Sequence, residues 1–181
     1  MAVNLTIGSE KWRERIHAGA ASLGIILQPS AVDSFSNHAR ELMRWNRKIN
    51  LTAITDPLDI AVKHYIDSIA PADLIPQNIR LLDIGSGAGF PAIPLKIISP
   101  TLTATLTDAV RKKVSFLNHA GRILTLKNYR ALHIRIDNKN GIQKINTELR
   151  RRSCGSNQED SHIRGDVEGH FDVVVARALA S

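Results

Sequence analysis

A glycine-rich stretch near the middle of the chain constrains its fold more than any other feature of the sequence. The run from Ile79 to Ile84 favours a short strand that ends in a glycine. Glycines then follow at alternate positions, where they permit a tight turn and let a ligand approach the backbone closely. A helix is expected from about Pro91 to Ile98. The stretch therefore predicts a strand, a ligand-holding loop and a helix in direct succession.

The chain after this loop alternates between strand-like and helix-like patterns. Strands are expected at Leu102–Leu106, ending at Asp108, and at Tyr129–Ile136, with a helix over Ala109–Leu124 between them. Phe171–Ala176 is rich in valine, which is typical of a central parallel strand that is buried on both faces. This alternation predicts an α/β fold built on a parallel sheet.

The chain before the loop shows only helical patterns. Residues from about Glu10 to Leu27 alternate basic and apolar residues in a way that fits a helix, with Gly24 as the expected stop. A second is expected to start at Ser30, which has capping-box spacing to Asp33. A third is expected after Asp56-Pro57, with the aspartate as N-cap and the proline at the first helical position.

Two regions and an insert follow from these patterns. We expect an N-terminal helical segment over residues 1–75 and an α/β domain over residues 76–181. A polar stretch over residues 138–170 carries three consecutive arginines, Arg150 to Arg152. We expect this insert to be a mobile surface loop, with a short helix from Ile142 to Arg151.

Composition limits the classes of partner and compartment. A net charge of +7 over 181 residues attracts polyanions such as RNA, DNA or an acidic membrane, without sequence preference. The single cysteine, Cys154, excludes an internal disulfide and a Cys-rich metal site, and suits a reducing cytoplasm. The most apolar stretch, Phe90–Ile98, is too short to span a bilayer. We therefore expect a cytoplasmic protein with no metal and no membrane partner.

The spacing of the glycines discriminates between two classes of nucleotide ligand. Dinucleotide-binding loops have the pattern G-x-G-x-x-G, but Phe90 occupies the last position here. The observed D-x-G-x-G-x-G pattern fits the loop of class I methyltransferases better. In that interpretation the amino-acid moiety of the ligand lies beside Asp83, and its ribose hydroxyls face Asp108 on the next strand. A glycine-rich turn without a ligand is the structural alternative.

The residues from Asp83 to Leu95 resemble the signature of the RsmG (GidB) family, in which G-F-P-G-I-P-L follows the loop. Further matching blocks occur in the same order, at Trp45–Ile54, Lys63–Ser68, Lys112–Leu117 and Ala176–Ala178. The resemblance implies a class I methyltransferase fold, a Rossmann-like parallel sheet, behind an N-terminal helical segment. It implies S-adenosylmethionine as the methyl donor, and N7-methylation of a guanine in the decoding-region loop of 16S rRNA. The expected partner is the small ribosomal subunit or its precursor.

The expected cofactor-binding residues have two origins. The resemblance implies contacts at Gly85, Phe90, Ile136, Asp137 and Arg177. The loop pattern and the ribose argument add Asp83, Gly87 and Asp108. No catalytic residue is assigned, because guanine N7 already carries a lone pair and methyl transfer to it needs placement rather than a strong base.

Several other polar residues have two interpretations. Arg177 follows a strand at its carboxyl end, where an arginine is expected to bind a ligand rather than form a structural salt bridge. His64 and Asp67, one helical turn apart, belong either to a packed helix face or to a pocket wall. Arg111, Lys112 and Lys113 form either a solvated face or a phosphate contact.

The sequence departs from the family pattern in three places. Ala92 replaces a usual glycine, and the insert is longer than the usual connection. The chain also stops at Ser181, just after the fourth strand, whereas family members continue. We therefore expect the C-terminal strands to be missing, which leaves the fourth strand as an exposed apolar edge. The alternatives to a methyltransferase are a non-catalytic RNA- or nucleotide-binding fragment and, against the position of Phe90, an NAD-dependent oxidoreductase.

Overall fold

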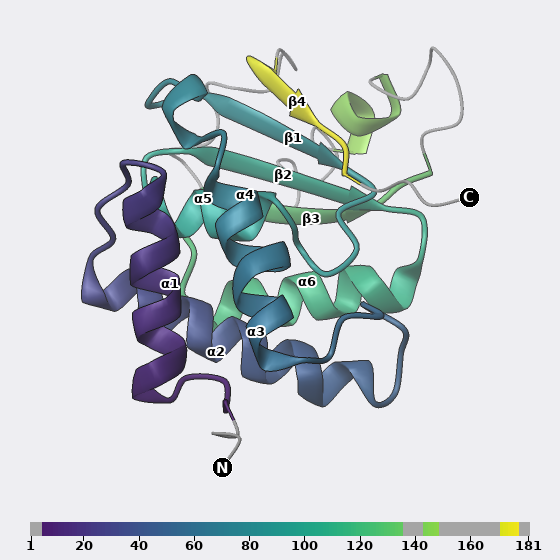
Figure 1. Ribbon diagram of the computed structural model, residues 1–181. Coiled ribbons are helices and arrows are strands. Elements are labelled where there is room, and N and C mark those ends of the chain that lie inside the picture. The colour runs from purple at the N-terminus through teal and green to yellow at the C-terminus, as the bar shows by residue number, and fades with distance from the viewer. Residues whose placement is uncertain (1–4, 136–142, 149–170, 178–181) are drawn as a thin grey trace.

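The computed structural model describes residues 5–135, 143–148 and 171–177. Four strands form its one sheet, in the order β3-β2-β1-β4, with every neighbouring pair parallel (Figure 1). The strands are β1 (Arg80–Ile84), β2 (Thr103–Asp108), β3 (Tyr129–His133) and β4 (Val173–Val175). This order is the first part of the 3-2-1-4-5-6 order of doubly wound folds. The predicted α/β fold with a parallel sheet is confirmed.

The first third of the chain is helical, as predicted. Its long helices are α1 (Glu10–Ser22) and α2 (Pro29–Asn46). The predicted start of α2 at Ser30 is wrong, because Pro29 takes the first helical position and Gln28 is the N-cap. The fixed φ of proline suits that position, and its missing N–H would have no partner there anyway.

A run of short helical elements follows α2. Asp56 caps α3 (Pro57–Asp59) by accepting hydrogen bonds from the amides of Leu58 and Asp59, so the predicted cap is confirmed. A π-helix (Ile60–Ile66), α4 (Asp67–Ile69) and a 3₁₀ turn (Ala72–Leu74) continue the run. π-Helical turns are rare and concentrate at functional sites.

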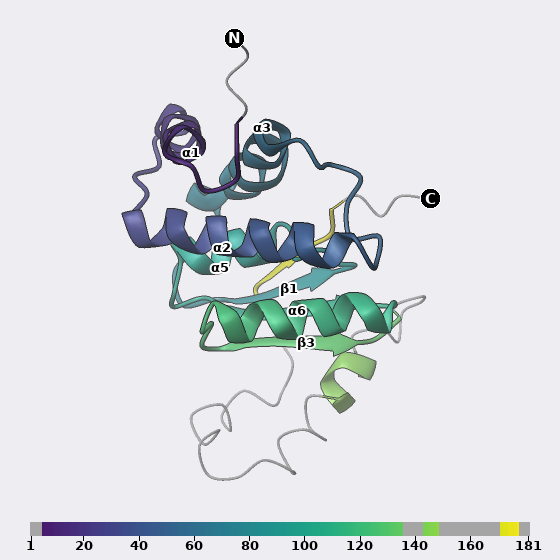
Figure 2. The same ribbon diagram turned by 90° about the horizontal axis from the view of Figure 1, so that it is seen from below.

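Helices cover one face of the sheet. The helix α5 (Ala92–Ile98) follows the glycine loop, and α6 (Arg111–Ile123) follows β2. Figure 2 shows α2 alongside both, on the same side as α1 and α3. A single hydrophobic core joins side chains of the N-terminal helices, such as Trp12 and Phe35, to Leu81 of β1. The division into residues 1–75 and 76–181 therefore stays a prediction.

The other face of the sheet carries a smaller cluster. Leu82 and Leu132 pack there against Ile145, which belongs to a short helix over residues 143–148. That helix lies within the predicted range of Ile142 to Arg151. The other residues of the predicted insert, 138–142 and 149–170, lie outside the described residues.

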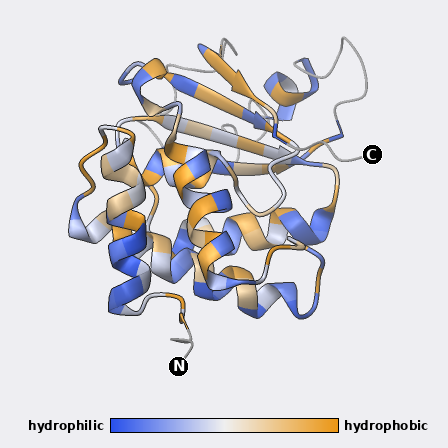
Figure 3. Ribbon diagram, in the orientation of Figure 1, coloured by the Kyte–Doolittle hydropathy of each residue, from blue (hydrophilic) through white to orange (hydrophobic). Residues whose placement is uncertain are grey.

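Strand β4 is less buried than the sequence predicted. The sequence predicted a strand buried on both faces, but Val174 is 51% exposed. The reason is that β4 pairs with β1 alone among the described strands and forms the edge of the sheet. Figure 3 shows it as hydrophobic along its length. Asp172 anchors its start through two hydrogen bonds with the Arg80 backbone, at 2.7 and 2.9 Å.

Candidate active site at the carboxyl ends of the strands

The glycine loop turns sharply between β1 and α5. All three of its glycines have positive φ, 70° at Gly85, 55° at Gly87 and 89° at Gly89, a region that residues with a side chain rarely adopt. The amide of Ser86 donates to the carbonyl of Thr107 on β2 at 2.9 Å. The loop is therefore held against the end of the neighbouring strand.

Two of these glycines serve different purposes. A Cβ on Gly89 would lie 2.3 Å from the Cδ1 atom of Ile93, so a side chain there would have to displace that fully buried residue of α5. A Cβ on Gly87 would meet nothing nearer than the Gly85 carbonyl oxygen, at 3.9 Å. Gly89 thus closes the loop against its helix, whereas Gly87 presents bare backbone to a space that a ligand can enter.

Asp83 is a fully buried carboxyl group directly before the loop. Neither of its carboxyl oxygens has a hydrogen-bond partner among the described residues. Burial raises the pKa of Asp83 to about 7, and the Ser86 hydroxyl and the Ala92 amide nearby oppose this only in part. A buried carboxyl without partners is costly, so a ligand that donates hydrogen bonds to it would be stabilised there.

Asp108 lies at the carboxyl end of β2, beside the loop. Its Oδ2 atom accepts from the Gly87 amide at 3.0 Å, and its Oδ1 atom accepts from the Val110 amide at 2.7 Å. Each carboxylate oxygen can accept a second hydrogen bond, so both can still bind hydroxyl groups. The negative charge of Asp108 also contributes to the raised pKa of Asp83, which places the two carboxyl groups in one site.

The ring of Phe90 packs into the N-terminal helices. It is 7% exposed and stacks on His64, with ring centroids 4.3 Å apart and an interplanar angle of 7°. The rings of His38 and Tyr65 also pack against it, with centroids 5.3 and 5.4 Å from the centroid of the Phe90 ring. The resemblance implies a cofactor contact at Phe90, and in the structure its ring fastens the end of the loop to the helical segment.

His64 links the loop to the turn that follows α2. Its Nε2 atom lies 2.9 Å from the Thr52 hydroxyl. The Asn46 side chain in turn donates to the Thr52 carbonyl at 2.9 Å and accepts from the Leu51 and Thr52 amides. Burial, and then the charge of Arg177, lower the pKa of His64 to about 4. The ring is therefore neutral at physiological pH and acts as a packed wall.

Arg177 follows β4 and reaches back to the π-helix. Its guanidinium donates to the Ser68 hydroxyl at 3.1 Å and to the Lys63 carbonyl, and lies 2.7 Å from the Asp67 carboxylate. It also lies near enough to Asp83 for its charge to favour the ionised carboxyl. The structural salt bridge, which was the alternative to ligand binding for Arg177, is therefore present. The arginine also lies at the edge of the site.

The structure brings together most of the predicted site residues and adds others. Gly85, Gly87, Asp83 and Asp108 meet at the loop, with Phe90 and Arg177 beside them, whereas Ile136 and Asp137 lie outside the described residues. Sequence reasoning missed His38, whose Nδ1 atom lies 2.9 Å from the Tyr65 hydroxyl and whose pKa burial lowers to about 3. Isolated residues in a helical pattern carry no signal that would have identified this pair.

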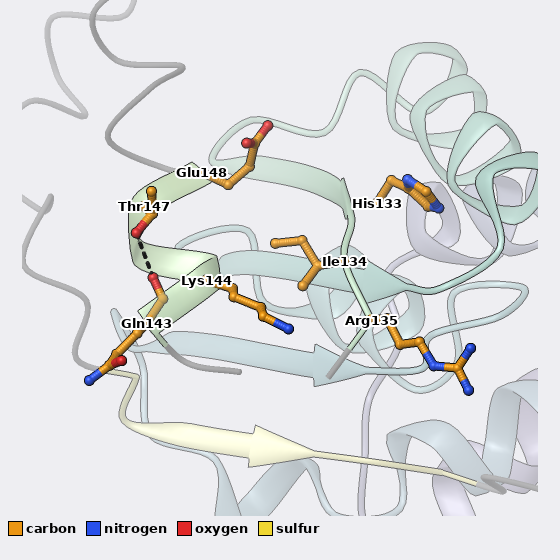
Figure 4. A pocket seen from close by; sticks show the side chains of 7 residues that line it. All are labelled: His133, Ile134, Arg135, Gln143, Lys144, Thr147 and Glu148. Carbon is orange, nitrogen blue, oxygen red and sulfur yellow. Dashed lines mark hydrogen bonds between the residues drawn. The ribbon is translucent and has the colours of Figure 1, made fainter. Parts of the chain in front are cut away.

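A separate cavity of about 630 Å³ opens on the second face of the sheet, where β3 ends (Figure 4). It lies between the strand end and the helix over residues 143–148, and it is lined by His133, Ile134, Arg135, Gln143, Lys144, Thr147 and Glu148. The described residues contain no cluster of three or more His, Cys, Asp or Glu side chains arranged to hold a metal ion. They also contain no helix that is long and apolar enough to cross a membrane.

Comparison with known proteins points to one family. The family model described as rRNA small subunit methyltransferase G (GidB) matches residues 31–181. A protein of Geotalea uraniireducens named ribosomal RNA small subunit methyltransferase G is 45% identical over 172 residues, which cover 95% of this chain and 68% of that protein. A protein of the same name from Geobacter sulfurreducens is 48% identical over 120 residues, which cover 66% of this chain and 55% of the relative.

Coverage of these relatives is partial. The alignments cover 55%, 58% and 63% of the length of three similar proteins from Geobacter species. Among solved structures, a protein-L-isoaspartate O-methyltransferase of Plasmodium falciparum in complex with S-adenosyl-L-homocysteine aligns with a TM-score of 0.47 and 14% identity. That alignment covers 91% of this chain and 72% of the other.

Proposed function

The chain belongs to the rRNA small subunit methyltransferase G family, and we propose that it methylates small-subunit ribosomal RNA with S-adenosylmethionine as the donor. The target atom in this proposal is N7 of a guanine in the decoding-region loop of 16S rRNA. The partner is the small ribosomal subunit or its precursor, in the cytoplasm. The observation that carries the proposal is the buried, unpartnered carboxyl group of Asp83 beside the bare backbone of Gly87.

The residues present fit S-adenosylmethionine. Asp83 offers two buried acceptor oxygens, which match the ammonium group of the donor's amino-acid moiety. Asp108 offers the remaining acceptor capacity of its carboxylate, which matches the ribose hydroxyls. The backbone at Gly87 can be approached closely, as a nucleoside requires. We propose that Ile136 and Asp137, which follow β3, hold the adenine.

The donor supplies an electrophilic methyl carbon on a sulfonium, and the chain's own residues bind and orient. Guanine N7 carries its lone pair in the neutral base, so no proton has to leave before the bond to carbon forms. The two histidines nearest the loop fit this chemistry. His38 and His64 are held neutral by burial and are engaged with Tyr65 and Thr52. Neither is arranged as a general base, and alignment of the reacting atoms is the expected source of the rate.

Arg177 and Phe90 contribute to the proposed donor site through other residues, namely Asp83 and the glycine loop. Arg177 is fixed by Asp67 and Ser68 at the edge where its charge favours the ionised form of Asp83. An ionised Asp83 binds a cationic donor more tightly than a protonated one. Phe90 fixes the end of the loop through its stack on His64. The N-terminal helical segment is therefore part of the proposed donor site.

Calorimetry on the whole chain tests the donor. We expect S-adenosylmethionine and S-adenosylhomocysteine to bind, and NAD not to bind, because Phe90 stands where a dinucleotide-binding loop has its third glycine. Asp83→Asn should weaken binding of S-adenosylmethionine. NAD binding in place of the methyl donor would overturn the proposal in favour of an oxidoreductase.

Methyl transfer from labelled donor to 16S rRNA and to small ribosomal subunits tests the substrate. Mass spectrometry of the digested RNA should locate one added methyl group on a guanine, and its alkaline lability distinguishes N7 from an exocyclic position. RNA binding without any donor binding would instead support a non-catalytic RNA-binding protein.

A further inference from the structure

Five cationic side chains gather where the end of α2 meets the start of α6. We call this surface the basic rim, and it consists of Arg47, Lys48, Arg111, Lys112 and Lys113. We propose that the basic rim holds the phosphates of the RNA strand whose base enters the donor site. This inference rests on the proposed function and adds to it the surface by which the substrate is bound.

Contacts between the two helices bring the members of the rim together. The Trp45 ring lies 5.7 Å from Phe116 and 5.2 Å from His119, and the His119 Nε2 atom lies 2.7 Å from a carboxylate oxygen of Glu41. Earlier residues of α2 therefore face later residues of α6, so the helices run antiparallel. The last turn of α2 then lies beside the first turn of α6, as Figure 1 and Figure 2 show.

The rim is a surface of uncompensated charge. Arg47, Lys48, Arg111 and Lys112 are exposed and Lys113 is half-buried. None of the five forms an ion pair with a described residue. Other cations of the chain do have such partners, since Arg44 pairs with Glu41, Lys63 with Asp59, and Arg177 with Asp67. Figure 3 shows both helix ends as hydrophilic.

The start of α6 also opposes the local preference of a helix. Its first turn holds Arg111, Lys112 and Lys113 and no acidic residue, and no side chain caps it. Cations near a helix N-terminus interact unfavourably with the helix dipole, and acidic residues would be stabilising there. Natural sequences break such local rules mainly at functional sites. Binding of an anionic partner would explain why three cations stand in this turn.

The position of the rim favours RNA over an acidic membrane. Only Ala109 and Val110 separate Arg111 from Asp108, and the Val110 amide donates to the Asp108 carboxylate at 2.7 Å. The rim thus begins three residues after the proposed ribose acceptor, within about 11 Å even for a fully extended chain, at the carboxyl ends of the strands. A strand held by its phosphates at this distance can extend a base toward the glycine loop, whereas a bilayer offers the loop no substrate.

Two charge-reversal variants of equal charge test the proposal. Arg111→Glu with Lys112→Glu alters the rim. Arg122→Glu with Lys127→Glu alters exposed cations at the other end. Arg122 lies in the last turn of α6, about 16 Å from Arg111 by helix geometry, and Lys127 follows the helix. Fluorescence anisotropy measures the affinity of the whole chain for a short labelled RNA hairpin over a range of KCl concentrations. Phosphate contacts carry no sequence information, so a hairpin of arbitrary sequence is a valid probe.

The rim variant should bind RNA more weakly, by roughly tenfold for each phosphate that it no longer holds at 0.1 M salt, with a shallower dependence of affinity on salt. The control variant should stay within roughly threefold of the unaltered chain. The rim variant should also melt at a higher temperature, because it places acids in the first turn of α6. A rise in stability together with a loss of RNA affinity excludes unfolding as the cause.

Other outcomes would overturn the inference. Equal losses of affinity in the two variants would mean that RNA senses only net charge, and an unchanged affinity in the rim variant would mean that RNA binds elsewhere. Binding to vesicles of phosphatidylserine and phosphatidylcholine that is abolished in the rim variant, with RNA affinity retained, would assign the rim to a membrane. Calorimetry with S-adenosylmethionine on the same proteins separates this test from the proposed function. Failure of the chain to bind the donor would overturn the proposed function. The RNA affinities of the two variants, by contrast, test only whether the basic rim binds RNA.

Discussion

The guanidinium of Arg177 lies 2.7 Å from the carboxylate of Asp67, so an ion pair joins the segment after β4 to the helical run that precedes the sheet. The pair is partly exposed, with 30% of the arginine side chain and 62% of the aspartate side chain accessible. Exposed pairs contribute little to stability. Its importance is positional, because the same arginine lies beside the candidate donor site and lowers the pKa of both Asp83 and His64.

Removing the charge of Asp67 should therefore affect donor binding more than folding. For Asp67→Asn we expect a loss of less than about 1 kcal/mol in the free energy of unfolding. The dissociation constant for S-adenosylmethionine should rise several-fold, while kcat changes little, because Arg177 loses the charged member of the three groups that hold it. Asp59→Asn is the matched control, since it breaks the exposed pair with Lys63 nearby on the same helical run. Equal affinities in the two variants would show that the Asp67 pair does not position the arginine.

The buried carboxyl of Asp83 predicts that donor affinity depends on pH. Because its pKa is raised to about 7, Asp83 is largely protonated at pH 6 and largely ionised at pH 8. The ionised form attracts the cationic donor, so affinity should increase as pH rises through 7. Calorimetric titration of S-adenosylmethionine between pH 6 and 8 measures the effect. The Asp83→Asn variant should bind weakly and without this pH dependence; a dependence that survives the substitution would implicate another group.

The same group should change how stability responds to pH. A folded-state pKa above the unfolded value means that the native state keeps a proton that the unfolded state releases, so stability from Asp83 is lost as pH rises from about 4 to 7. His38 and His64 act in the opposite sense. Their pKa values are lowered to about 3 and 4, so stability from them is lost as pH falls below 6.5.

These opposed contributions make a distinct prediction for one variant. Asp83→Asn should be more stable than the unaltered chain at pH 8, on the order of 2–4 kcal/mol if Asp83 is ionised there without a partner. It should also lose stability more steeply between pH 6.5 and 4, because the opposing contribution of Asp83 is then absent while the two histidines still titrate. Urea denaturation at a series of pH values tests both statements, and parallel stability curves for the two proteins would contradict them.

Two of the three glycines of the loop, Gly87 and Gly89, should separate folding from binding. Gly89→Ala forces a side chain against Ile93 at a positive φ and should destabilise the fold by about 2 kcal/mol or more. Gly87→Ala meets no close atom and should cost about 1–2 kcal/mol, mainly from its φ of 55°. Its methyl group enters the space proposed for the donor, so affinity should fall far more than stability. Thermal melts and calorimetry on both variants check this, and unchanged affinity in Gly87→Ala would move the ligand away from that glycine.

Much of the fold could be predicted from the sequence, because in most elements the local conformational preferences and the hydrophobic periodicity indicate the same structure. The strand before Gly85, the helix after the loop and the cap at Asp56 each follow from a residue type whose conformational preference is strong. The start of α2 was misassigned because Ser30 gave a capping signal, while Pro29 competed with a stronger one. The burial of β4 could not be judged from its valines, since burial depends on which strands lie beside it.

The candidate site divides in the same way. The backbone part, from Asp83 to Asp108, is local in sequence and was predictable from spacing. The side-chain contacts that brace it are not local. Arg177 meets Asp67 across more than a hundred positions of the sequence, and Phe90 stacks on His64, which belongs to the π-helix. Sequence patterns record which residue types are present but not which distant helices a fold brings into contact.

The hydrogen-bonded series from Asn46 through Thr52 to His64, which ends on the ring of Phe90, has a practical consequence. Grafting the glycine loop and its sheet onto another protein would leave that ring without the surface it rests on. A transplanted domain would therefore need its N-terminal helices as well. Substitutions near Asn46 are expected to change the affinity for the proposed donor more than the local structure around Asn46.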